Sequence, residues 1–177
     1  PSTRPLARRL WGCLLGRRRT KLACCTCVQR RHGWSSSSLL WSLTSLPNTV
    51  HWCLHNVKPL WRLHMVHHSD THVDVTTGTR HHPLDFVVRE CFALAAVLVA
   101  GAPLAFYLFY RILTIFFTYL VHANVELPER VDRAISWVFV SPNMHKFHHH
   151  HEAPWTDRNY GNMLSVWDRI FGTFTYG

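Results

Sequence analysis

The sequence predicts an all-α protein: an integral membrane helical bundle in which a short hydrophobic hairpin carries a histidine-rich helical cap with a dimetal site. Three observations predict this fold class. Hydrophobic residues make up 47% of the 177 residues and charged residues only 16%, whereas about a quarter of a soluble domain is charged. An apolar run over residues 91–121 is interrupted near its middle. Three separate segments carry histidines at the spacing of one helix face.

The positive charge is confined to the first quarter of the chain. Residues 1–47 contain nine of the 19 basic residues and no acidic residue, and residues 48–177 contain the other ten basic residues and all ten acidic ones. The part with the histidine clusters is therefore neutral, which argues against a nucleic-acid partner. The Arg-, Ser- and Cys-rich segment 1–47 lacks helical or strand periodicity. A transit peptide, a tail on anionic lipid and a sequence that is not native coding all stay open.

Two helices are expected at the start of the second region, 48–177. Asn48 follows Pro47 and is a plausible N-cap, which predicts a helix over residues 49–57. Pro59 suits the first turn of a helix, which predicts a second helix over about residues 60–71.

The apolar run predicts a tight helical hairpin. A single helix over residues 91–121 would overshoot a hydrocarbon core of about 30 Å at about 1.5 Å per residue. The turn signal Gly101-Ala102-Pro103 divides the run into arms over 85–101 and 104–122. Because the arms have almost no polar face, we expect a multi-pass membrane protein, with a buried hairpin of a soluble protein as the alternative.

The remaining segment predicts three short helices. Residues 131–140 form an amphipathic pattern suited to the membrane interface. Ser141 is placed to cap the helix that carries the third histidine cluster. A last helix is expected over 163–171, ending at Gly172.

The histidine clusters indicate a shared metal site. Imidazole is the commonest ligand for zinc, iron, copper and nickel. Eight or nine histidines are too many for one ion and suit two. The lack of a Glu-x-x-His motif argues against the soluble carboxylate di-iron bundles. The candidates are His51, His55, His64, His67, His68, His145, His148 and His149, with His122 as a ninth.

The clusters HWCLH (51–55), HMVHH (64–68) and HKFHH (145–149) resemble the three histidine boxes of the fatty acid hydroxylase and sterol desaturase superfamily. The stretches LWRLHMVHHSDTHVDVTTGTRHHP (60–83), HANVELP (122–128) and NYGNMLSVWDRIFGT (159–173) are similar in the same order. The resemblance covers about residues 51–177. It implies a membrane-bound non-haem di-iron enzyme that uses dioxygen to hydroxylate or desaturate a lipid of the sterol or fatty acyl class.

The resemblance also implies cofactors, partners and residue roles. The nine histidines would bind two iron ions, or zinc in a recombinant sample, and no catalytic residue is expected beyond these ligands. His82 would lie behind the ligands, and Asp157 and Asp168 are candidate hydrogen-bond partners for them. Electrons would come from an external reductase with a cytochrome or ferredoxin. The enzyme would reside in the endoplasmic reticulum of a eukaryote or in the inner membrane of a bacterium.

One stretch departs from the family pattern. The sequence SSSSLLWSLTSLPNTV (35–50) precedes the first box, where the family has clean membrane spans and often an aspartate. We therefore expect the fatty acid hydroxylase-like domain over 48–177 to be incomplete. The alternative function is that of a non-catalytic or truncated membrane metal-binding relative.

Overall fold

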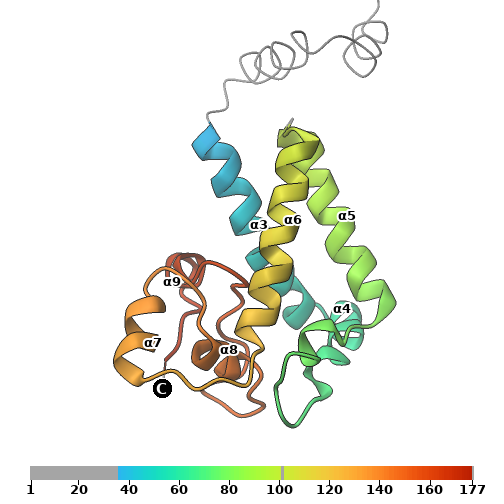
Figure 1. Cartoon of the computed structure of the whole chain (residues 1–177). Coiled ribbons are helices and arrows are strands. Elements are labelled where there is room, and N and C mark those ends of the chain that lie inside the picture. The colour runs from blue at the N-terminus through green and yellow to red at the C-terminus, as the bar shows by residue number, and fades with distance from the viewer. Residues whose placement is uncertain (1–35, 101, 177) are drawn as a thin grey trace, which may run out of the picture.

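The computed structural model describes residues 36–100 and 102–176, and these residues form helices and turns with no β-strand (Figure 1). The predicted all-α class is therefore confirmed for the described part of the chain. Residues 1–35, which make up most of the basic segment, and Gly101 of the predicted turn lie outside it.

Long helices form one end of the molecule and short elements form a cap at the other (Figure 1). Helices α3, α5 and α6 are the long ones, and the histidine clusters lie where they meet the cap. In chain order the elements are α3 (Ser36–Asn56), α4 (Lys58–His64), the 3₁₀ helices η1 (His67–Ser69) and η2 (Thr77–Thr79), α5 (Pro83–Ala100), α6 (Leu104–Val121), α7 (Glu129–Ile135), α8 (Pro142–His148) and α9 (Val166–Phe171).

Helix α3 continues through Pro47, so the prediction that a helix begins after Asn48 is wrong. The Asn48 side chain does not cap a helix; it is buried, and its Nδ2 donates to Asp168 Oδ1 at 3.1 Å. Proline removes one backbone hydrogen bond from a helix. This tertiary hydrogen bond and the burial of Val50 and Leu54 on the same helix offset that loss. The predicted boundary between residues 47 and 48 thus falls inside a helix.

Helices α5 and α6 form the predicted hairpin. Helix α6 is the one helix among the described residues that is long and apolar enough to cross a membrane, and most of its surface is exposed. Helix α5 has the same length but carries Asp85, Arg89 and Glu90 in its first half. A single candidate span supports membrane association and leaves the multi-pass topology a prediction.

The helix predicted over residues 60–71 is wrong beyond His64, where α4 ends. The chain makes a turn and resumes as η1, which begins at His67. Hydrogen bonds to the following loop compete with the helical path: the Thr77 carbonyl lies 3.0 Å from His67 Nδ1, and the Thr77 hydroxyl donates to Asp70. Because the helix ends here, the second histidine box is divided between two elements.

The amphipathic helix predicted over 131–140 is also shorter in the structure. Helix α7 ends at Ile135, and the carbonyl of Ser136 accepts hydrogen bonds from Ser165 Oγ and Arg169 Nη2. The chain then runs extended, and Phe139 forms an isolated antiparallel bridge with Leu164. These contacts to the C-terminal segment replace the continued helix.

The caps of α8 and α9 follow the sequence predictions. Ser141 Oγ accepts from the Met144 backbone N–H at 3.1 Å, which is an N-cap contact. Helix α9 begins at Val166, three residues later than predicted, and ends at Gly172, whose φ of 72° is readily adopted by glycine.

Candidate metal centre

The nine predicted histidines lie in two groups, and within each group the candidate nitrogen atoms lie within 4.8 Å of one another. We call them the five-histidine group and the four-histidine group. The first consists of His51, His55, His64, His68 and His148, and the second of His67, His122, His145 and His149. The other predicted histidine, His82, is in neither group.

The two HxxHH boxes are each shared between both groups. His64 and His68 of the second box lie in the five-histidine group, whereas His67 lies in the other. In the third box the assignment is reversed: the i, i+4 pair is in the four-histidine group, and His148 lies in the five-histidine group. The prediction that the three imidazoles of a box share one helix face therefore does not mean that they enter the same group. In the third box, on α8, the helix itself explains the division, because residue i+4 lies close to residue i and residue i+3 lies on the other side of it. In the second box the break between α4 and η1 separates His64 from His67 and His68.

In most of these imidazoles, the hydrogen bond made by Nδ1 determines whether Nε2 carries a proton or a lone pair. In six of the nine histidines, Nδ1 lies 2.7–3.1 Å from an oxygen that can only accept. The oxygens are the carbonyls of Tyr160, Thr77, Thr118 and Arg158 and the carboxylates of Asp157 and Asp85. A neutral imidazole that donates from Nδ1 has its lone pair on Nε2. These six histidines therefore turn lone pairs toward the centre of their group.

The Nε2 atoms converge in a way that favours a bound cation. His51 Nε2 and His64 Nε2 are 3.1 Å apart, and neither has a proton to donate to the other. His122 Nε2 lies 3.0–3.2 Å from the Nε2 atoms of His67, His145 and His149. The buried Nε2 atoms of His55, His68 and His148 have no hydrogen-bond partner among the described residues. Converging lone pairs repel one another unless a metal ion lies between them, so the donor set fits two ions.

Burial keeps these imidazoles neutral, the form that binds metal. Desolvation lowers the pKa of His64 and His122 to about 4 and that of His148 to about 3. It lowers the pKa of His51 and His145 well below the usual value as well. At neutral pH the nitrogens are therefore available as ligands without losing a proton.

Asp85, which the sequence did not single out, is a carboxylate partner of the grouped imidazoles, and Asp168 is not. The fully buried Asp85 accepts from His64 Nδ1 at 3.1 Å, His81 Nδ1 at 2.9 Å and Arg89 Nε at 3.1 Å. His81 also stacks on His67 at 4.3 Å between ring centroids. His81 thus occupies the supporting position that the sequence assigned to His82, whose Nδ1 accepts from the Leu84 backbone instead. The i, i+4 spacing of His81 and Asp85 at the start of α5 was the signal available.

Of the two carboxylates predicted as partners of the imidazoles, Asp157 contacts one directly and Asp168 contacts none. Asp157 accepts from His55 Nδ1 at 3.0 Å, as predicted, from an exposed position. Asp168 contacts no imidazole; its two oxygens accept from the backbone N–H groups of Tyr160 and Gly161 at 2.8 Å. It thereby fixes the backbone at Tyr160, whose carbonyl accepts from His51 Nδ1, so Asp168 supports that imidazole indirectly.

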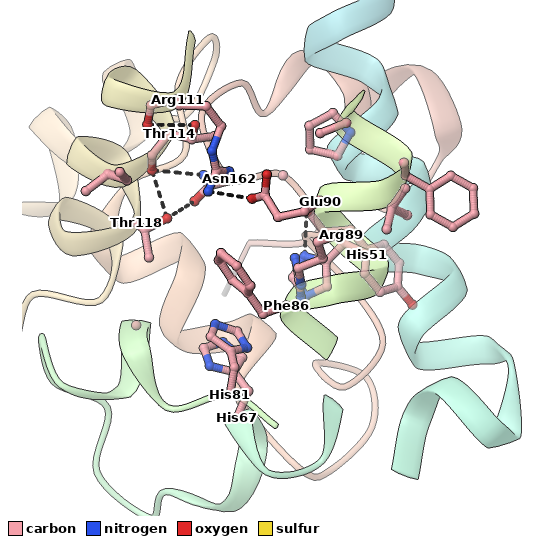
Figure 2. Close-up of a pocket in the computed structure, with 18 of the residues that line it drawn as sticks. His51, His67, His81, Phe86, Arg89, Glu90, Arg111, Thr114, Thr118 and Asn162 are labelled. Atoms are coloured by element: carbon pink, nitrogen blue, oxygen red, sulfur yellow. Dashed lines mark hydrogen bonds and ion pairs between the residues drawn. The ribbon is translucent and has the colours of Figure 1, made fainter. Parts of the chain in front are cut away.

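A cavity of about 410 Å³ lies against both groups (Figure 2). It reaches His51 of the five-histidine group and His67, His122 and His145 of the four-histidine group. Its other walls come mostly from α3, α5 and α6, with η2 and residues 160–162 completing them, and are largely apolar; Phe86 lies in the centre of the view. A hydrocarbon chain would fit such a space with one of its carbons beside the histidines.

The fold and the site define a helical protein whose buried imidazoles could bind metal ions beside an apolar cavity. The chain belongs to the fatty acid hydroxylase family, whose model matches residues 43–173. This membership confirms the resemblance seen in the histidine boxes.

Similar proteins are lipid-modifying oxygenases. The chain is 31% identical over 125 residues to ornithine lipid hydroxylase OlsE of Rhizobium tropici, covering 71% of this chain and 37% of that protein. It is 26% identical over 129 residues to alkylglycerol monooxygenase of Caenorhabditis elegans, covering 70% and 24%. For the Homo sapiens alkylglycerol monooxygenase the identity is 27% over 125 residues, covering 70% and 27%. The chain thus spans between a quarter and about two fifths of these relatives' lengths. No solved structure matches it.

Proposed function

We propose that the chain binds two iron ions, one in each histidine group, and oxidises a membrane lipid with dioxygen. The observation that carries the proposal is the convergence of the Nε2 atoms in both groups at the edge of one apolar cavity. Membership of the fatty acid hydroxylase family supports oxidation of a lipid. The named relatives are a hydroxylase and monooxygenases, which favours hydroxylation over desaturation.

The chain's own residues would position the ions and the lipid. Bound iron supplies the activation of dioxygen, which the protein side chains cannot provide. The histidines hold the ions in place, and the oxygens behind them fix the ring orientations. The apolar wall excludes water and holds a C–H bond close to the ligands. Val50 and Phe86 line the space that the hydrocarbon would occupy.

Two partners complete the proposal. The lipid reaches the cavity from a membrane in which α6 is embedded, and α6 is apolar enough to cross one. The two electrons that the oxidation requires would come from a separate reductase with a cytochrome or ferredoxin. The multi-pass topology and residence in the endoplasmic reticulum or bacterial inner membrane belong to the same proposal.

The test measures metal and product in the same membranes. The chain is expressed in cells, its iron is counted by inductively coupled plasma mass spectrometry, and the cellular lipids are compared with those of cells without it. We expect about two irons per chain, as the two groups require, and a lipid that has gained one oxygen atom. Oxygen-dependent product from a chain without bound metal would contradict the proposal. Two irons with no product would support the alternative, a non-catalytic metal-binding relative.

A further inference from the structure

The cavity wall contains an ion pair, which Figure 2 places across Phe86 from His67 and His81. Glu90 of α5 and Arg111 of α6 meet with Oε1 and Nη2 2.5 Å apart, and the Tyr107 hydroxyl donates to Glu90 Oε2 at 2.8 Å. In Figure 2, Arg111 and His67 lie on opposite sides of Phe86. Both oxygens of the Glu90 carboxylate therefore have partners, and the pair joins the two arms of the hairpin.

Arg111 keeps hydrogen-bond donors free toward the cavity. A guanidinium has five N–H donors, and Glu90 is the one partner of this guanidinium among the residues that the structure describes. Its side chain is 28% exposed and lines the cavity. A charged residue within an apolar helix that can cross a membrane is costly. Such residues usually face the bundle interior or a cavity, pair with one another as Arg111 does with Glu90, and mark a path for substrates or ions.

The charges around the cavity are balanced. Glu90 neutralises Arg111, and Asp85 neutralises Arg89, the other arginine of the wall. A phosphate or an ammonium group would therefore meet no uncompensated opposite charge. A neutral oxygen acceptor matches the spare donors of Arg111 without disturbing this balance.

We propose that Arg111, held by Glu90, selects the substrate by donating to a neutral carbonyl or hydroxyl oxygen of an acyl or alkyl lipid whose hydrocarbon chain passes Phe86 to the histidines. This inference deepens the proposed function and rests on it, because the bound lipid is a substrate only if the chain oxidises it. The separation between Arg111 and the histidines then determines which carbon of the chain lies beside the metal ions.

Binding can be tested without turnover, in the full chain loaded with zinc and held in detergent micelles. Three photoreactive probes carry the same diazirine-bearing C16 chain: a monoacylglycerol, a free fatty acid and a plain hydrocarbon. After irradiation, the labelled peptides are quantified by mass spectrometry. We expect the monoacylglycerol to label cavity residues most strongly, and the Arg111→Met variant to lose roughly tenfold or more of that labelling, the value of one hydrogen bond to a charged group. Labelling by the hydrocarbon should not change.

Two further variants separate recognition from folding. Arg133→Met is the matched control, because Arg133 pairs with Glu129 on the exposed surface of α7, and its labelling should equal that of the wild type. The exchange variant Glu90→Arg/Arg111→Glu keeps an ion pair but moves the donors to α5. If the pair were only structural, the exchange would restore labelling; we expect it to stay low while the zinc content remains at the wild-type level.

Three results would overturn the inference: monoacylglycerol labelling that survives Arg111→Met, labelling restored by the exchange, or stronger labelling by the free fatty acid. A chain that binds the monoacylglycerol through Arg111 but oxidises no lipid would contradict the proposed function alone. The position of the added oxygen in the product is a second measurement, since Arg111→Met should spread it over several carbons.

Discussion

The five-histidine group and the four-histidine group are drawn from the same boxes but are supported differently. Two carboxylates, Asp85 and Asp157, accept from imidazoles of the five-histidine group. Among the described residues, the Nδ1 hydrogen bonds of the four-histidine group go to backbone carbonyls alone, through His67 and His122, and the buried Nδ1 atoms of His145 and His149 have no partner. Carboxylates make a ligand more basic and orient it more firmly than carbonyls do. The five-histidine group should therefore hold its metal more tightly.

The largest expected effect comes from the four-histidine group. His122 Nε2 lies within 3.2 Å of the Nε2 atoms of all three other histidines in that group. The variant His122→Ala should retain about one iron of the proposed two and lose lipid oxidation to the detection limit, because both ions are needed for the reaction. Metal analysis and lipid mass spectrometry of the same membranes measure both. His151→Ala is the control, since that side chain is exposed and lies outside both groups. Loss of both irons would mean that the two groups are not separate sites.

A smaller effect should distinguish the carboxylates behind the five-histidine group. Asp85→Asn removes the negative charge behind His64 inside a fully buried site and should lower metal affinity there by roughly 10–100-fold. Asp157→Asn affects His55 from a side chain that is 59% exposed, where solvent screens the interaction, and should lower it much less. Competition with a chelator measures both affinities. Equal losses in the two variants would contradict the difference in burial.

Acidification should destabilise the metal-free chain through both groups, because burial lowers the pKa of His64 and of His122 to about 4. An unfolded histidine titrates near about 6.5, so between these values the unfolded chain binds more protons than the folded one. Stability of the metal-free chain is therefore greatest above about pH 6.5 and is lost as the pH falls toward 4. Each histidine contributes up to about tenfold in the unfolding equilibrium per pH unit. Denaturant unfolding at several pH values tests this, and a flat profile between pH 7 and 5 would contradict it.

The smallest expected effect adds one methyl group beside the four-histidine group. A Cβ at Gly78 would lie 3.2 Å from His122 Nδ1 and 3.1 Å from Thr118 Cγ2. Gly78→Ala should displace the imidazole slightly and lower the rate several-fold, since a shift of about 1 Å can cost roughly a hundredfold. Iron content should stay at the wild-type value. The control is Gly172→Ala, where the added Cβ meets no atom within 4 Å and the left-handed backbone costs stability alone. An unchanged rate in Gly78→Ala would show that the group tolerates the displacement.

The sequence was most informative where local chemistry decides the outcome. The hairpin arms, the Ser141 cap, the end of α9 at Gly172 and the gathering of the nine histidines all follow from composition, spacing or turn residues. Their metal ligation and the iron count stay predictions. Tertiary contacts decided the rest. Pro47 lies inside a helix because Asn48 is held by a residue 120 positions away.

The division of each box between the two groups was also beyond the sequence. Spacing shows that three histidines share a helix face, but it does not show that they divide between two groups. His81 was missed for a similar reason. Its role depends on Asp85 and on the ring of His67, and the turn that brings them together ends α4 earlier than its helical pattern suggests.

Helix α6 leads directly into His122, so the bilayer around the helix can affect the position of this imidazole. Helix α6 has 18 residues, about 27 Å at about 1.5 Å per residue, and the next residue is His122. If α6 spans the bilayer as proposed, a change in bilayer thickness is met by a change in helix tilt. That tilt would be transmitted to His122 without an intervening loop. The thickness of the host membrane would thereby become a variable of the proposed metal centre, alongside the identity of the proposed lipid substrate.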